Sequence, residues 1–201
     1  MSTDPRRMLD NRLAVLAKHA GSQPSYGGDS PAHRAYAYAY FRTAMEYYQG
    51  GDLVAGYNSL LAAARIFPAL VLDHASYYEL ACSEQGRGSQ GDLGQLDIAA
   101  RQREILDIAR RLSVEPDLQT ARRAAGIEDG ELRPAQLEAA ALWAAGLLYY
   151  QAGAANPARS ALIQAGRLKP TLFGDRRFGA LFVRAMAGAR QVALLKRMQG
   201  S

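Results

Sequence analysis

Two stretches of this sequence match each other and decide its fold: YYQGGDLVAGYNSLLAAARIFPAL at 47–70 and YYQAGAANPARSALIQAGRLKPTL at 149–172. A shift of 102 residues relates them. In the first stretch the identical positions are Tyr47, Tyr48, Gln49, Gly51, Leu60, Ala63, Arg65, Pro68 and Leu70. Self-similarity at a fixed separation is typical of a chain built from repeated structural units. The sequence therefore predicts two copies of one unit.

Each copy has the pattern of two helices joined by a tight turn. The small residues Ala44 and Gly146 occupy equivalent helical regions and would let paired helices approach closely. The shared glycine at Gly51 permits a tight turn, because glycine adopts backbone conformations that other residues avoid. The shared proline at Pro68 cannot continue the second helix and ends the unit. The pattern predicts an antiparallel helix pair in each copy.

The rest of the chain also has helical patterning, and no segment shows sustained β alternation. Asp4–Pro5 and Ser30–Pro31 are typical helix starts, with a capping side chain before a first-turn proline. Between them lies AGSQPSYGGDS, a glycine-rich stretch that is typical of a flexible connector. We therefore predict an all-α protein, divided into an N-terminal helix and linker at 1–30 and a helical domain at 31–201. The expected helices are 5–20, 31–49, 53–67, 69–84, 98–115, 118–125, 135–151, 156–168 and 175–198.

The spacing of the matching small, aromatic and proline residues resembles the tetratricopeptide repeat, since 102 is three times its 34-residue period. In the first unit the matching residues are Tyr40, Ala44, Tyr47, Gly51, Gly56, Leu60, Ala63 and Pro68. In the second they are Leu142, Ala145, Gly146, Tyr149, Gly153, Ala158, Leu162, Ala165 and Pro170. The resemblance implies a right-handed α-solenoid of antiparallel helix pairs with a terminal capping helix. Residues 85–138 depart from the pattern through a glycine-rich loop and a longer helix.

The order of the segments resembles a second, narrower group. A helical unit, a glycine-rich loop, a long helix, a second unit and a basic final helix follow one another, as in the region after the catalytic domain of some bacterial glycosyltransferase family 2 proteins. RRMLDNRLAVLAKHAGSQP at the start and LFVRAMAGARQVALLKRM at the end are similar to parts of that region. No Asp-x-Asp pair is present. The resemblance implies a non-catalytic accessory region that positions the enzyme, its protein partner or its glycan acceptor. The alternative is a stand-alone adaptor that binds a peptide or protein.

Repeat arrays usually bind partners along the concave face formed by the first helix of each unit. Aromatic and polar side chains between the packing positions of these helices are therefore candidate contacts, because aromatic groups supply much of the binding energy at interfaces. Packing of the same residues against neighbouring helices is the alternative. The candidate residues are Tyr38, Phe41, Met45, Tyr48 and Gln49 in the first unit, and Trp143, Leu147, Tyr150 and Gln151 in the second.

Positive charge is concentrated at the C-terminal end. The chain carries a net charge of +5, but residues 1–166 hold 16 basic and 18 acidic side chains, whereas residues 167–201 hold eight basic side chains and a single acid, Asp175. Such a helix either caps the array or makes peripheral contact with an anionic membrane. The residues proposed for anionic contact are Arg176, Arg177, Arg184, Arg190, Lys196 and Arg197.

The remaining chemistry-bearing residues form no recognisable catalytic pattern. Cys82 is the single cysteine, and the three histidines show no metal-ligand spacing. The GRGSQG sequence at 86–91 fits a dinucleotide loop only between a strand and a helix, which the helical pattern does not provide. TARRAAGI at 120–127 resembles the start of a helix-turn-helix, but Gly130 and Pro134 interrupt the place of the second helix. We therefore predict no enzymatic activity, cofactor or nucleic-acid partner. No secretory signal is present, and we expect a cytoplasmic protein, with the inner face of the membrane as a further location.

Overall fold

The computed structural model describes residues 4–83, 93–127 and 133–199, with side chains up to residue 187, and it is all-α with no strand among them. The all-α prediction is thus confirmed for this part of the chain. Most helix bounds lie within one or two residues of the expected ones. The helices are α1 (Pro5–Ala20), α2 (Pro31–Gln49), α3 (Leu53–Ile66), α4 (His74–Ala81), α5 (Ile98–Ser113), α6 (Pro116–Ala124), α7 (Pro134–Gln151), α8 (Ala155–Leu168) and α9 (Arg176–Gln199), with 3₁₀ turns η1 (Pro68–Leu72), η3 (Leu93–Gln95) and η4 (Pro170–Gly174).

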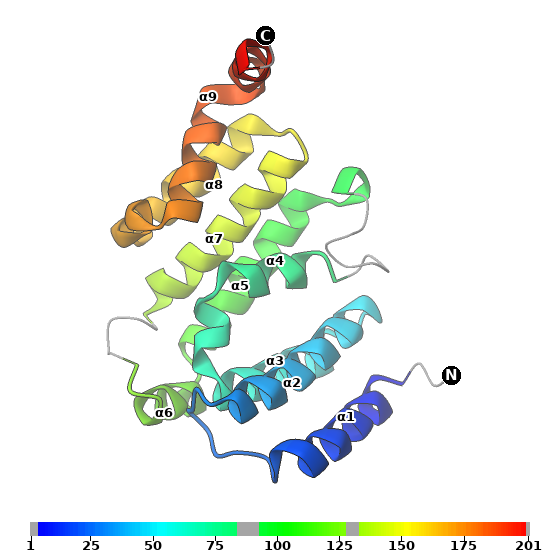
Figure 1. Cartoon of the computed structure of the whole chain (residues 1–201). Coiled ribbons are helices and arrows are strands. Elements are labelled where there is room, and N and C mark those ends of the chain that lie inside the picture. Colours follow the sequence, from blue (N-terminus) through cyan, green and yellow to red (C-terminus); the bar gives the residue numbers. More distant parts are fainter. Residues whose placement is uncertain (1–3, 84–92, 128–132, 200–201) are drawn as a thin grey trace.

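The helices are stacked in an elongated arrangement that follows the chain from one end to the other. Figure 1 shows α1 at one end, next to α2, and α8 and α9 at the other end. Helix α3 pairs with α2. Helices α4, α5 and α7 lie between these ends, and α6 lies beside α3. The pairs α2–α3 and α7–α8 have the most extensive packing in the molecule. Each pair is therefore a helical hairpin, as its short connecting turn requires.

The two copies of the sequence repeat have the same backbone geometry. The turn glycines Gly51 and Gly153 have φ angles of 80° and 77°. Helices α3 and α8 occupy matching positions 102 residues apart, and so do the turns η1 and η4 that follow them. The residues that end the two helices, Phe67 and Lys169, both have φ near −135° and ψ near 85°. The matching sequence therefore encodes a matching structure that extends through the 3₁₀ turn.

One predicted helix is divided in the structure. The expected helix at 69–84 consists of η1 and the short helix α4, because Asp73 lies between them in an extended conformation. The Asp73 carboxylate accepts a hydrogen bond from the Ala75 N–H at 2.9 Å and so starts a new helix. Asp175 has the equivalent position before α9 and accepts hydrogen bonds from the N–H groups of Arg177 and Phe178.

Within a hairpin, the two helices approach closely at small residues, as the sequence indicates. A Cβ atom added to Gly146 of α7 would lie 2.7 Å from the Leu162 side chain of α8, so a larger residue would displace the buried Leu162 side chain. Ala44, the equivalent residue of α2, is fully buried. One continuous apolar core runs through all units, with contributions from α2 to α9. The hydrophobic effect of burying this core supplies the main stabilisation of the stack.

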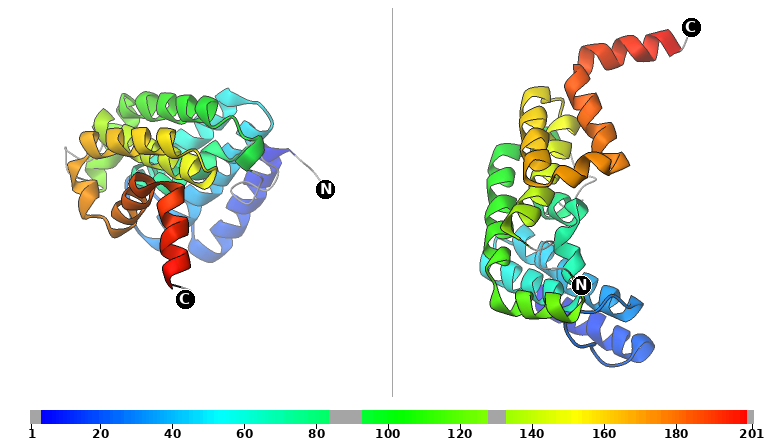
Figure 2. Two further views of the ribbon diagram at one scale, coloured as in Figure 1. Left: turned by 90° about the horizontal axis from the view of Figure 1, so that it is seen from above. Right: turned by 90° about the vertical axis from the view of Figure 1, so that its left-hand side faces the viewer.

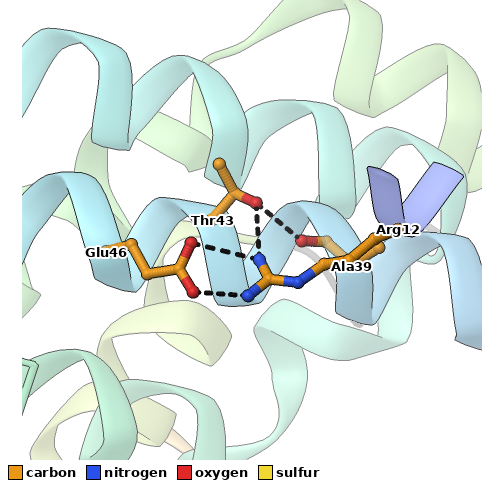
Figure 3. A network of polar contacts seen from close by, with 4 residues as sticks. All are labelled: Arg12, Ala39, Thr43 and Glu46. Carbon is orange, nitrogen blue, oxygen red and sulfur yellow. Dashed lines mark hydrogen bonds and ion pairs between the residues drawn. The ribbon is translucent and has the colours of Figure 1, made fainter. Parts of the chain in front are cut away.

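Helix α1 and the segment after it are attached to the stack by specific polar contacts. The Arg12 guanidinium donates hydrogen bonds to both carboxylate oxygens of Glu46 and to the Thr43 hydroxyl, which itself donates to the Ala39 carbonyl (Figure 3). In the connector, the Gly27 N–H donates to the Arg65 carbonyl at 2.9 Å. Because Gly27 is also buried, the glycine-rich connector packs along the end of α3.

Helix α9 is docked through its first half. Phe178, Leu181 and Ala185 are buried against the preceding elements, mainly α8 and η4. The Arg159 guanidinium of α8 donates hydrogen bonds to the carbonyls of Ala185 and Met186. Figure 2 shows the last part of α9 turning away from the stack beyond these residues. Within the described part of the chain, no helix is both long enough and apolar enough to cross a membrane.

Candidate partner-binding cleft

A cleft opens where α4, α7 and α9 meet. Its first part, of about 510 Å³, is lined by the start of α4, the first half of α7, the η4 turn and the start of α9. Its second part, of about 560 Å³, continues along α7, with α9 as the opposite wall. Both parts share His74, Trp143, Arg176 and Arg177, so they adjoin. Together they follow α7 from Gln136 to Gln151, a distance of about 22 Å along a helix.

Basic side chains outnumber acidic ones around the cleft. The cations that line it are Lys169, Arg176, Arg177 and Arg184. The two carboxylates, Asp73 and Asp175, are both engaged in capping the helices that follow them. A hydrogen bond with His74 is the main cause of the lowered pKa of Asp73, and the charge of Arg177 adds to it. The second part of the cleft contains arginines and no acid.

An aromatic cluster supports the wall of the cleft. The His74 ring is stacked on Trp143 with ring centres 3.6 Å apart and planes 6° apart. Trp143 in turn contacts Phe178 in a perpendicular arrangement at 5.3 Å. Phe173 and Phe182 pack around Phe178 and complete the cluster. Because Trp143 is 8% exposed, it forms the base of the cleft and offers little ring surface to a ligand.

The candidate residues of the second unit lie together in this cleft. Leu147 and Tyr150 are partly exposed and, with Gln151, line its second part beside Trp143. The Tyr78 hydroxyl of α4 donates a hydrogen bond to the Gln151 side-chain oxygen at 2.5 Å. From the sequence, these residues and the basic final helix are predicted as two separate candidate sites. The structure places both on opposite walls of one cleft.

The candidate residues of the first unit do not form an equivalent surface. Phe41 and Tyr48 are buried in the core, and Met45 is partly buried against it. Burial raises the pKa of Tyr48, and the nearby carboxylates Glu104 and Asp107 of α5 raise it further. Tyr38 is 49% exposed and lines a different, apolar groove between α1 and α2. Gln49 is exposed at the end of α2.

The residues proposed for anionic contact fall into two groups, those that line the cleft and those whose side chains the structure does not describe. Arg176, Arg177 and Arg184 are exposed and line the cleft. The side chains of Arg190, Lys196 and Arg197 lie outside the described residues. The GRGSQG segment at 86–91 and Gly130 also lie outside them.

Sequence reasoning missed His74 and Lys169 as members of the cleft. The internal repeat contained the signal for His74, because His74 follows the capping Asp73 as Arg176 follows the capping Asp175. Lys169 corresponds to Phe67, so the repeat gives no signal for it. This correspondence places His74 and Arg176 each at the start of the helix after a 3₁₀ turn. It does not show that the two helix starts lie next to each other across α7, which depends on how the units are packed.

Other reactive groups lie away from the cleft. Cys82 is buried at the end of α4, and burial raises the pKa of its thiol to about 11, so the thiolate is scarce at neutral pH. Over the described ranges, no three histidine, cysteine or carboxylate side chains are grouped closely enough to hold a metal ion.

Comparison of the chain with models of protein families, with curated proteins and with solved structures found no match.

Proposed function

We propose that this chain is a non-catalytic interaction domain that binds a segment of a partner protein in the cleft between α4, α7 and α9. The observation that carries the proposal is the convergence of Leu147, Tyr150 and the α9 arginines around one groove. A groove with an apolar base and a polar rim has the composition of a protein-binding site. Its length of about 22 Å would hold about six or seven residues of extended chain.

We further propose that the domain is a tetratricopeptide-like array of helix pairs, with the first half of α9 as its cap. The shift of 102 residues and the matching turns at Gly51 and Gly153 support this architecture. An added Cβ at Gly146 would lie 2.7 Å from the Leu162 side chain, which supports close packing within the α7–α8 pair. In such arrays the terminal helix covers the apolar face of the last unit, and the burial of Phe178 agrees with that role.

Panning of a random heptapeptide library on the full chain tests the proposed cleft. Ala180 is exposed and lines the groove, so Ala180→Trp would fill the groove without disturbing the core. Val183 is 65% exposed on the same helix and does not line the groove, so Val183→Trp is the matched control. We expect enriched peptides to bind the parent chain and the Val183→Trp variant, and to lose binding to the Ala180→Trp variant.

Trp143 provides a direct readout of the same binding. It is the single tryptophan of the parent chain and lies at the base of the cleft, so a peptide bound to the parent chain should change its fluorescence. Binding to the two tryptophan variants is measured with labelled peptide. Enriched peptides that bind the Ala180→Trp variant as well as the parent chain would place the binding site elsewhere. A library that yields no enriched peptide on the parent chain would contradict the proposed function.

The resemblance to the helical region of glycosyltransferase family 2 proteins supports a more specific proposal, in which the domain positions such an enzyme, its partner or its glycan acceptor. The alternative is a stand-alone adaptor. We expect an antibody raised against this chain to detect a native polypeptide two or three times larger than 21.8 kDa in the source cells. A native band near 21.8 kDa would instead favour the adaptor.

A further inference from the structure

From the charges and shape of the cleft, we propose that its natural occupant is an acidic segment of a partner protein, held in an extended conformation. This inference rests on the proposed function and adds the chemistry of the partner. Its starting point is the uncompensated positive charge of the cleft wall. Among the described residues, Lys169, Arg176 and Arg184 form no ion pair, although all three line the groove.

The carboxylates near these cations do not neutralise the groove. The lining holds two carboxylates, Asp73 and Asp175, against four cations, Lys169, Arg176, Arg177 and Arg184. One oxygen of each carboxylate accepts backbone hydrogen bonds at the start of α4 or α9. An acidic ligand would therefore meet a net positive surface, which favours its association and excludes basic segments.

The arrangement of the arginines indicates the spacing of the acidic groups. Arg177 and Arg184 lie two helical turns apart on the face of α9 that lines the groove, which corresponds to about 10 Å along the helix. In a peptide with the polyproline II conformation, an extended form with three residues per turn, residues three positions apart lie on the same side of the chain and about 9 Å apart. Between the arginines lie Ala180 and Leu181, opposite Leu147 of α7, and they form an apolar base. The cleft thus fits acidic residues at every third position with small or apolar residues between them.

Other anionic partners fit this surface less well. A single-stranded nucleic acid would need exposed aromatic rings for base stacking, whereas Trp143 is covered by His74 and buried, and Tyr150 is only partly exposed. A membrane surface would need the apolar side of α9, whose residues Phe178, Leu181 and Ala185 are packed into the protein. The arginines Arg176, Arg177 and Arg184 of α9 line a groove opposite α7, which a narrow peptide enters and a flat lipid surface does not.

Three heptapeptide libraries test this inference, with glutamate, glutamine or lysine fixed at positions 1, 4 and 7 and the other positions random. Each is panned on the full chain, beside the fully random library. We expect enrichment from the glutamate library and none from the glutamine and lysine libraries. Peptides enriched from the glutamate library should bind the Arg177→Gln and Arg184→Gln variants about three- to fivefold more weakly, the effect of one exposed charge pair.

The matched control is Arg123→Gln, because Arg123 is an exposed arginine on α6 and lines none of the cleft. This variant should bind the glutamate peptides like the parent chain. Equal enrichment from the glutamine or lysine library, with loss of binding in the Ala180→Trp variant, would overturn the acidic occupant and leave the proposed function intact. Failure of every library would overturn both. Binding to anionic lipid vesicles that falls in the Arg184→Gln variant and not in the Ala180→Trp variant would show that a membrane is the partner.

Discussion

Replacing Phe178 with alanine is expected to destabilise the protein by about 3–5 kcal/mol, the usual cost of removing a fully buried phenylalanine. Phe178 has 0% exposure and contacts Trp143, Phe173 and Phe182. Its removal would leave a cavity between α7 and α9 that the surrounding rings cannot fill without leaving their own contacts. For a chain of this length, the loss corresponds to a decrease in melting temperature of about 10 °C.

The measurement is thermal unfolding followed by circular dichroism, with Val183→Ala as the control on the same helix. Val183 is 65% exposed, so its truncation should change the melting temperature by less than about 2 °C. Phe178→Ala should also alter the fluorescence of Trp143, because the two rings are in contact. A Phe178→Ala variant that melts like Val183→Ala would contradict the docked position of α9.

The second large effect is expected at Gly27, where alanine should cost about 3 kcal/mol in total. The residue has a φ angle of 77°, which costs an alanine about 1–2 kcal/mol. In addition, a Cβ atom would lie 2.0 Å from the Ala121 carbonyl oxygen of α6 and 2.8 Å from the Ala124 side chain. Since a backbone atom is the obstacle, the connector must move, which would weaken its hydrogen bond to Arg65.

Gly153 is a matched control for this substitution. Its φ angle is also 77°, but no atom lies within 4 Å of an added Cβ. Gly153→Ala therefore has the conformational cost alone, and the difference between the two variants measures the packing of the connector. We expect Gly27→Ala to unfold at a lower urea concentration than Gly153→Ala. Equal midpoints would mean that the connector does not pack against α6.

Much of the secondary structure follows from local signals in the sequence. Asp4 and Ser30 cap helices that begin at the prolines after them, as expected, because an oxygen acceptor followed by proline favours a helix start. The one divided helix, at 69–84, has a local cause that is also visible in the sequence. Asp73 has a counterpart in Asp175, and both aspartates act as helix caps after a 3₁₀ turn.

Burial of the candidate contacts was not predictable from local patterns. Phe41 and Trp143 occupy equivalent places in the repeat and both lie in the core, whereas the equivalent tyrosines Tyr48 and Tyr150 differ. Tyr48 is covered and lies near acidic residues of α5, whereas Tyr150 borders the open groove. A repeat encodes the same hairpin twice, but it does not encode what packs on each copy.

The sequence by itself determined that the chain is helical, where its helices start and that one hairpin occurs twice, because these properties depend on residues a few positions apart. The tertiary structure alone decided which faces remain uncovered. His74, Tyr150 and Arg184 are far apart along the chain, and only the packing of α4 and α9 on α7 brings them around one cleft. Such contacts depend on how the helices are packed against one another, which short-range patterns do not specify.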